Sequence, residues 1–221
     1  MHIPDGIIDG TTSAGYAAVA AGGLGVALRR TGAYLSEREV PLAALVAAFV
    51  FAAQMVNFPV IAGMSGHLLG GVLAAVLVGP AAGFVVLTVV LIVQALVFAD
   101  GGLSALGVNV VDMALVGAVG GYAVFAVTAR LLGGIRRRIP LAAAVAAFLS
   151  VPLAAAGFVL AFAIGGTAGV SLTKLAVAML GSHVLIGVGE AVITGVVVGA
   201  VIAGRPDLVF GARRLGEEVA A

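Results

Sequence analysis

Long apolar segments, separated by short polar breaks, run through the whole chain. They cover residues 12–28, 41–56, 66–79, 81–99, 108–129, 140–163 and 174–203. A transmembrane helix needs about 20 mostly apolar residues to cross a hydrocarbon core of about 30 Å. The pattern therefore predicts an all-α polytopic membrane protein with about seven transmembrane helices, forming a single integral-membrane domain over residues 1–221.

Two of the seven segments are short for a membrane crossing. The segment at residues 66–79 would rise only about 21 Å as a helix, and the segment before it ends at Asn57, Phe58 and Pro59. Irregular backbone is tolerated at membrane depth where it is buried or lines a cavity. We therefore expect the stretch between these two segments to dip into the protein.

Composition narrows the class of protein further. Of the 221 residues, 62% are hydrophobic and only 10% are charged, with a mean hydropathy of +1.26, whereas soluble domains carry about 25% charged residues. This excludes a soluble enzyme and a disordered chain. The net charge of +1 gives no basic excess for nucleic acid. Cysteine is absent, so thiolate metal sites and disulfides are excluded.

Basic residues indicate the orientation. Ten of the eleven Lys and Arg residues follow the first, third, fifth and seventh segments, and Lys174 alone falls on the other side. By the positive-inside rule, residues 1–11 are extracellular and residues 205–221 form a cytoplasmic tail of a multi-pass protein in the plasma (inner) membrane. The first ten residues contain two acids and no base, unlike a signal peptide, so we expect Met1 to begin the mature chain.

One helix face carries only small residues. Ala44, Ala48 and Ala52 recur at helical spacing, which permits close helix contact. We expect this face to pack internally. The alternative is a docking surface for a separate membrane partner, and Ala14, Ala18 and Ala21 form a second such face on the first segment.

The three histidines, His2, His67 and His183, all fall toward the outer side of the predicted topology, where they could converge on one site. His2 is the most informative of them. The Met1 amine, the His2 amide nitrogen and the imidazole Nδ1 can chelate one metal ion in a five-membered and a six-membered ring. His67, which is flanked by glycines, could supply a fourth nitrogen. Planar nitrogen ligation suits Ni(II) or Cu(II). The alternative is that His2 is simply a polar terminal residue.

Glu190 is the carboxylate deepest within a predicted span, and it follows His183 by seven residues, which places both on one helix face. We expect a structural polar pair. Two alternatives remain, in which Glu190 is protonated or orients a metal ligand.

Further polar residues cluster near the outer ends of the predicted spans. Asp100, with Asn109 and Asp112 after it, could form an outer loop of oxygen ligands that funnels ions inward, or an ordinary tight turn. Gln54 and Asn57 could brace the backbone of the loop that contains Ser65 and His67.

Several catalytic signatures are missing from the sequence. No Walker-type phosphate-binding motif, His-Glu-x-x-His or Gly-x-Ser-x-Gly occurs. We therefore expect that this chain does not hydrolyse ATP and is not an enzyme. We also expect it to carry no permanent cofactor.

Taken together, several motifs resemble the CbiM/NikM family, the substrate-binding membrane (S) components of cobalt and nickel energy-coupling-factor transporters. They are Met1-His2-Ile3-Pro4-Asp5-Gly6, the loop from Gly63 to Gly71 around His67, Asp100-Gly101-Gly102, Gly107-Val108-Asn109, and Met113. The resemblance covers essentially the whole chain. Ile7-Ile8 departs from it, because an aromatic residue and a leucine are common there in the family.

The resemblance implies that the Met1 amine, the His2 amide and imidazole, and His67 hold Co²⁺ or Ni²⁺ as a transported ion. It also implies four partners: a membrane coupling (T) subunit, two ATPase (A) subunits and a small accessory membrane subunit. Such transport would supply cobalamin biosynthesis or nickel enzymes. The alternative function is a self-sufficient ion-coupled metal permease in which Glu190 carries the proton.

Overall fold

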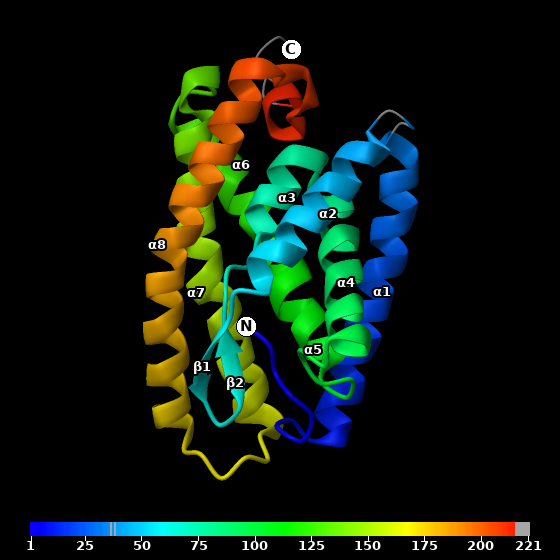
Figure 1. The fold of residues 1–221 in the computed structure, drawn as a ribbon, viewed down its shortest axis with the longest axis vertical. Coiled ribbons are helices and arrows are strands. Elements are labelled where there is room, and N and C mark those ends of the chain that lie inside the picture. Colours follow the sequence, from blue (N-terminus) through cyan, green and yellow to red (C-terminus); the bar gives the residue numbers. More distant parts are fainter. Residues whose placement is uncertain (36, 38, 215–221) are drawn as a thin grey trace.

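The computed structural model describes residues 1–35, 37 and 39–214 as a bundle of helices with one small hairpin (Figure 1). The elements are α1 (Gly10–Tyr34), α2 (Val40–Gln54), β1 (Phe58–Ile61), β2 (Met64–Gly66), α3 (Gly71–Val78), α4 (Pro80–Val97), α5 (Leu106–Val110), the π-helical η1 (Val111–Gly120), α6 (Gly121–Leu131), the 3₁₀ turn η2 (Arg136–Arg138), α7 (Ile139–Gly165), α8 (Leu172–Gly204) and the 3₁₀ turn η3 (Pro206–Leu208). The all-α prediction therefore holds except for the hairpin.

Five of the described helical stretches are long and apolar enough to cross a membrane: α1, α4, the continuous stretch 106–131, the stretch 136–165, and α8. The two remaining predicted segments became α2, with 15 residues, and α3, with eight. Helices of that length rise about 22 Å and 12 Å. The hairpin completes their path, because α2 leads down into β1 and β2 leads back up into α3 (Figure 1). The number of complete crossings stays a prediction.

The expected dip between the short segments is this hairpin. Its strands are antiparallel, with Phe58 opposite Gly66 and Pro59 opposite Ser65. Ala62 and Gly63 form the turn with φ angles of 48° and 80°. From its turn, the hairpin returns the chain to the middle of the bundle, where residues 67–70 connect β2 to α3 (Figure 1).

Helix α3 lies at the centre of the bundle, and all eight of its residues are buried. Its first residue, Gly71, packs so closely on η1 that an added Cβ would lie 2.7 Å from the Gly117 carbonyl carbon. Helix α8 turns one face inward, formed by Met179, His183, Gly187 and Glu190 among others. The predicted common face of His183 and Glu190 is confirmed.

The prediction of internal packing for the alanine face on α2 is wrong, because Ala44, Ala48 and Ala52 are all exposed in this chain. Helix α2 buries Val46, Val50 and Gln54 instead. The alanine face shares the outer side of α2 with the larger side chains Leu45 and Phe49, which are exposed as well. Ala14, Ala18 and Ala21 on α1 are exposed as well.

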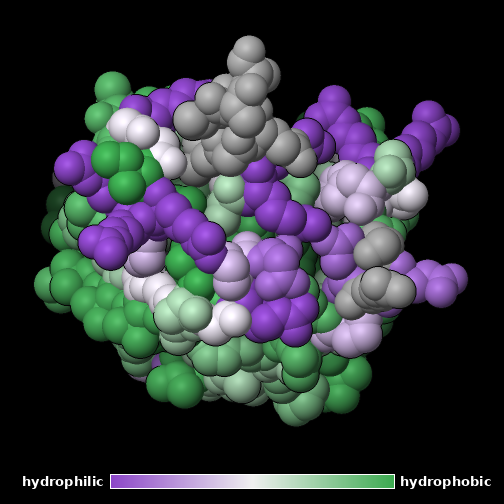
Figure 2. Space-filling model, turned by 90° about the horizontal axis from the view of Figure 1, so that it is seen from above, coloured by the Kyte–Doolittle hydropathy of each residue, from purple (hydrophilic) through white to green (hydrophobic). Residues whose placement is uncertain are grey.

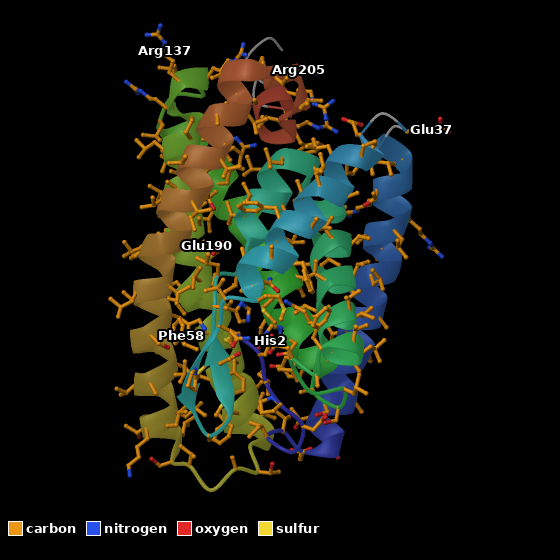
Figure 3. All side chains as sticks on the ribbon, viewed as in Figure 1. His2, Glu37, Phe58, Arg137, Glu190 and Arg205 are labelled. Carbon is orange, nitrogen blue, oxygen red and sulfur yellow. The ribbon has the colours of Figure 1, made fainter. Side chains whose placement is uncertain are left out.

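The two ends of the bundle differ in charge. Arg137, Arg205 and Glu37 lie at the end where α1 and α8 finish (Figure 3). Seen from that end, hydrophilic residues gather over the surface while hydrophobic residues follow the periphery (Figure 2). Lys174 begins α8 at the opposite end. This asymmetry agrees with the predicted orientation, which stays a prediction. Of the predicted tail, residues 215–221 lie outside the described residues.

Candidate metal site

The N-terminal segment, residues 1–9, lies against the bundle, and the chain begins inside it at Met1. Backbone hydrogen bonds attach it along its length: Asp9 N donates to Gly165 O (2.7 Å), Thr167 N to Ile7 O (2.9 Å) and Gly102 N to Ile3 O (2.8 Å). Met1 and Ile3 are fully buried. The chain start is therefore held as part of the core, far from the solvent where a free terminus usually lies.

Asn109, at the start of the helix 106–131, holds the first residues of this segment in place. Its Oδ1 accepts from Ile3 N (3.0 Å) and its Nδ2 donates to Ile3 O (3.2 Å). Gly101 and Gly102 make room for the segment. A Cβ at Gly101 would lie 3.0 Å from His2 Cδ2, and one at Gly102 would lie 2.3 Å from Asp5 N. The segment can pass only because these two residues have no side chain.

The buried Met1 amine contacts Nε2 of His67. On the far side of the ring, His67 Nδ1 lies 2.7 Å from the Leu68 carbonyl oxygen. A carbonyl only accepts, so Nδ1 carries the proton and Nε2 presents a bare lone pair. The amine and this imidazole nitrogen are thus two metal donors already side by side.

His2 lies against His67, with ring centroids 4.3 Å apart. Its Nε2 is 3.1 Å from Oε1 of the buried Gln94, so Nε2 carries the proton and Nδ1 is bare. Among the described residues Nδ1 has no hydrogen-bond partner. The His2 amide donates to Ser65 Oγ at 3.3 Å. Every donor of the predicted chelate is therefore in this one place.

Burial removes protons from these donors. It lowers the pKa of the Met1 amine and of the His67 ring well below their ordinary values, and it lowers the pKa of His2 to about 3. While it is protonated, the neighbouring amino terminus acts in the same direction on both rings. At neutral pH the amine and both imidazoles are therefore neutral, which is the state that binds a metal ion.

The loop after His67 is held from two sides. Glu190 accepts from Leu69 N (2.9 Å) and from Gly70 N (2.6 Å), while Gln54 Nε2 donates to Leu69 O (2.7 Å). Both side chains are buried, and Glu190 lies inside the bundle (Figure 3). The brace expected from Gln54 is confirmed. Of the three roles considered for Glu190, its contacts fit the one in which it orients a metal ligand.

His183 does not pair with Glu190, so that prediction is wrong. Its Nδ1 donates to Met179 O at 2.7 Å, one helical turn back, while both Glu190 oxygens accept from the loop amides. The structure does not join His183 to His2 and His67 as a third imidazole of one metal site. Within the described residues, no three side chains of His, Asp or Glu are placed to share a metal ion. The site combines two imidazoles with backbone nitrogen.

Asp100 lies beside His2, with its Oδ1 3.2 Å from His2 Nδ1. Asn57 donates to its Oδ2 at 2.9 Å, so the prediction that Asn57 braces the His67 loop is wrong. Asp100, Asn57, His2 and Ser65 line a cavity of about 280 Å³. Asp112 is not part of this outer loop, because it is buried within η1.

Sequence reasoning missed Gln94, the residue that sets the tautomer of His2. It is the one amide in the apolar stretch 81–99. A buried amide at membrane depth is costly unless it has a partner, and this signal was available from the sequence.

Comparison with known proteins gives a consistent result. The profile of the family CbiM, described as "Cobalt uptake substrate-specific transmembrane region", matches residues 2–208. A putative metal transport protein of Haloquadratum walsbyi is 37% identical over 95% of this chain and 94% of its own length. A putative fused nickel transport protein NikMN of Archaeoglobus fulgidus is 38% identical over 95% of this chain and 68% of its own. The cobalt transport protein CbiM of Geobacter sulfurreducens is 36% identical over 94% of this chain and 61% of its own.

The fold agrees with a solved structure as well. A crystal structure of a truncated transition metal transporter superposes with a TM-score of 0.84 at 31% identity, covering 92% of this chain and 99% of that one. The predicted resemblance is thus confirmed.

Proposed function

The chain belongs to the CbiM family of cobalt-uptake substrate-specific transmembrane regions, and on that basis we propose how it handles its ion. It captures Co²⁺ or Ni²⁺ at the outer face with four nitrogens: the Met1 amine, the deprotonated His2 amide, His2 Nδ1 and His67 Nε2. The ion is cargo and no permanent cofactor is needed.

The contact between the buried Met1 amine and His67 Nε2 carries this proposal. A charged terminus would not be buried without strong compensation, whereas a neutral amine beside a bare imidazole nitrogen is ready to ligate. The His2 amide and ring complete the two chelate rings from the adjacent residue. Ser65 can support both states of that amide, because its hydroxyl accepts from the N–H and can donate once the proton has gone.

The captured ion is then handed over for ATP-driven import by an energy-coupling-factor transporter in the plasma membrane. The chain has no nucleotide-binding motif, so separate ATPase subunits supply the energy through a membrane coupling subunit, with a small accessory membrane subunit. The exposed alanine faces of α1 and α2 are suited to close contact with such a helical partner. Planar nitrogen ligation favours nickel, while the family description names cobalt, and both ions stay open.

Metal titration of protein with a native N-terminus tests the proposal. Purified protein is titrated with Co(II) and Ni(II) beside three variants: a chain extended before Met1, His2→Ala, and His183→Gln as a matched histidine control. We expect one tightly bound ion in the native and control proteins. We expect the extended chain and His2→Ala to lose it while keeping their helical content. Equal binding by the native and extended forms would remove Met1 and His2 from the site.

A further inference from the structure

The donors of the capture site are buried, so an incoming ion needs a route to them. Met1, His2 and His67 are each no more than 3% exposed. The cavity of about 280 Å³ at the outer side reaches His2 but not Met1 or His67. An ion that enters there meets His2 and Asp100 before any other metal donor of the site.

His2 Nδ1 and Asp100 Oδ1 face each other without a hydrogen bond between them. Their separation is 3.2 Å, yet Nδ1 has no hydrogen-bond partner among the described residues. Nε2 of His2 holds the ring proton against Gln94 Oε1, so Nδ1 has no proton to share with Asp100. Two bare lone pairs are therefore held close together, an arrangement that a cation would stabilise.

The spacing fits two ligands of one ion. Donors at about 2.1 Å from a metal ion and at right angles to each other lie about 3.0 Å apart. Imidazole and carboxylate are also both ordinary ligands of divalent transition metals. The 3.2 Å separation of the Asp100 and His2 donor atoms is within reach of that geometry.

The Asp100 carboxylate is held in this position by its surroundings. Asp100 N donates to Gln94 O at 3.0 Å, and Asn57 holds its second carboxylate oxygen. The turn before it places Ala99 at φ 53°, a left-handed conformation that an alanine rarely adopts. Such strained residues persist only where the surrounding structure fixes them, and they cluster at functional sites.

We propose that Asp100 Oδ1 and His2 Nδ1 form an outer, transient binding site at which a hydrated divalent ion is first held. This inference rests on the proposed function. The ion then exchanges ligands one at a time. It keeps its bond to His2 Nδ1 while the bonds to Asp100 and to its waters break, and bonds form to the Met1 amine, the His2 amide nitrogen and His67 Nε2. The amide proton leaves to water in the cavity.

An intermediate on the binding route has a distinctive kinetic signature. A carboxylate that contacts the ion only on its way in lowers the barriers to binding and to release by the same amount, so removing it slows both rates and leaves the equilibrium unchanged. Stopped-flow mixing of the native protein with Ni(II) or Co(II) measures both rates. For Asp100→Asn we expect association and dissociation each to slow by on the order of tenfold or more, with Kd changed by less than about threefold.

Two controls separate this role from others. Asp5→Asn removes a carboxylate from the same outer face, where Asp5 bonds Ser104 and does not line the cavity, and we expect wild-type rates. Asp100→Glu restores a carboxylate, and we expect it to recover part of the rate. Unchanged rates in Asp100→Asn, or a faster dissociation with a weaker Kd, would overturn the proposal.

Competition by Mn²⁺ gives a second measurement. It compares binding rates with and without Mn²⁺ within each protein, so a partly misfolded variant does not distort it. Mn²⁺ favours oxygen donors, so it should occupy the outer site and slow nickel uptake in the wild type but not in Asp100→Asn. Equal slowing in both proteins would contradict the outer site. If the wild type binds neither cobalt nor nickel, the proposed function itself fails, which is a different result from unaltered rates in the variant.

Discussion

Replacing Glu190 by Gln distinguishes a capture component from a proton-coupled permease. In this structure the two carboxylate oxygens accept from the amides of Leu69 and Gly70, directly after His67, a ligand in the proposed site. A glutamine of the same shape keeps one oxygen for one amide and turns its NH₂ group toward the other. One loop amide then faces a donor and loses its partner.

The expected loss of metal affinity follows from the one hydrogen bond that the loop loses. A hydrogen bond to a charged group contributes about 1.5–3 kcal/mol, and a buried donor left without a partner costs about 1–3 kcal/mol. If the loop relaxes by shifting His67, a loss of this order appears as weaker metal binding. We therefore expect Glu190→Gln to weaken Kd by about 10- to 100-fold, the range seen when partners that orient metal ligands are changed.

The assay is metal titration of the purified variant, beside uptake in cells. Asp112→Asn is a matched control, because it changes another buried acidic side chain, one whose Oδ2 has no hydrogen-bond partner among the described residues. We expect its Kd to stay within about threefold of wild type. Loss of uptake by Glu190→Gln with an unchanged Kd would refute the positioning role and support the permease.

Three further predictions concern the N-terminal donors. Because burial lowers the pKa of the Met1 amine and of both imidazoles, we expect metal binding at pH 7 to displace only the His2 amide proton. Calorimetry in two buffers should then find one proton released per ion, and the metal affinity should rise about tenfold per pH unit between pH 6 and 8. Release of two protons per ion would contradict this prediction. Gly102→Ala places a Cβ 2.3 Å from Asp5 N, so it should abolish metal binding while circular dichroism shows the helices intact. Gln94→Leu leaves His2 Nε2 without its acceptor and should weaken Kd about tenfold; wild-type affinity would show that the tautomer is not set there.

The sequence allowed the membrane class and the grouping of Met1, His2 and His67 to be predicted, and their role as metal donors stays a prediction. Hydrophobic segments extend over many residues, so a few misassigned residues do not change the prediction of a membrane protein. The Met1–His2 chelate is local, since its atoms belong to adjacent residues. His67 followed from a polar residue among glycines at membrane depth. Each of these inferences needs only neighbouring residues or overall composition.

The contacts between distant residues could not be predicted. Glu190 and His183 share a helix face, which is periodic and local, but their partners depend on which loop packs against that face. Asn57 was expected to bond the loop that follows it and bonds Asp100, 43 residues away. The alanines of α2 show the same limit, because helical spacing reveals a smooth face without revealing which side of the helix meets the core.

Four buried polar side chains connect the site to four different helices. Gln54 on α2, Gln94 on α4, Asn109 on α5 and Glu190 on α8 are each at most 3% exposed, and each has its partner in the N-terminal segment or the His67 loop. Opening the loop to release an ion would leave such groups without partners at membrane depth, at a cost of about 1–3 kcal/mol for each. In the proposed transport cycle, inward release would therefore require the helices to move together with the loop, and an external energy source would supply that work better than a chain acting alone.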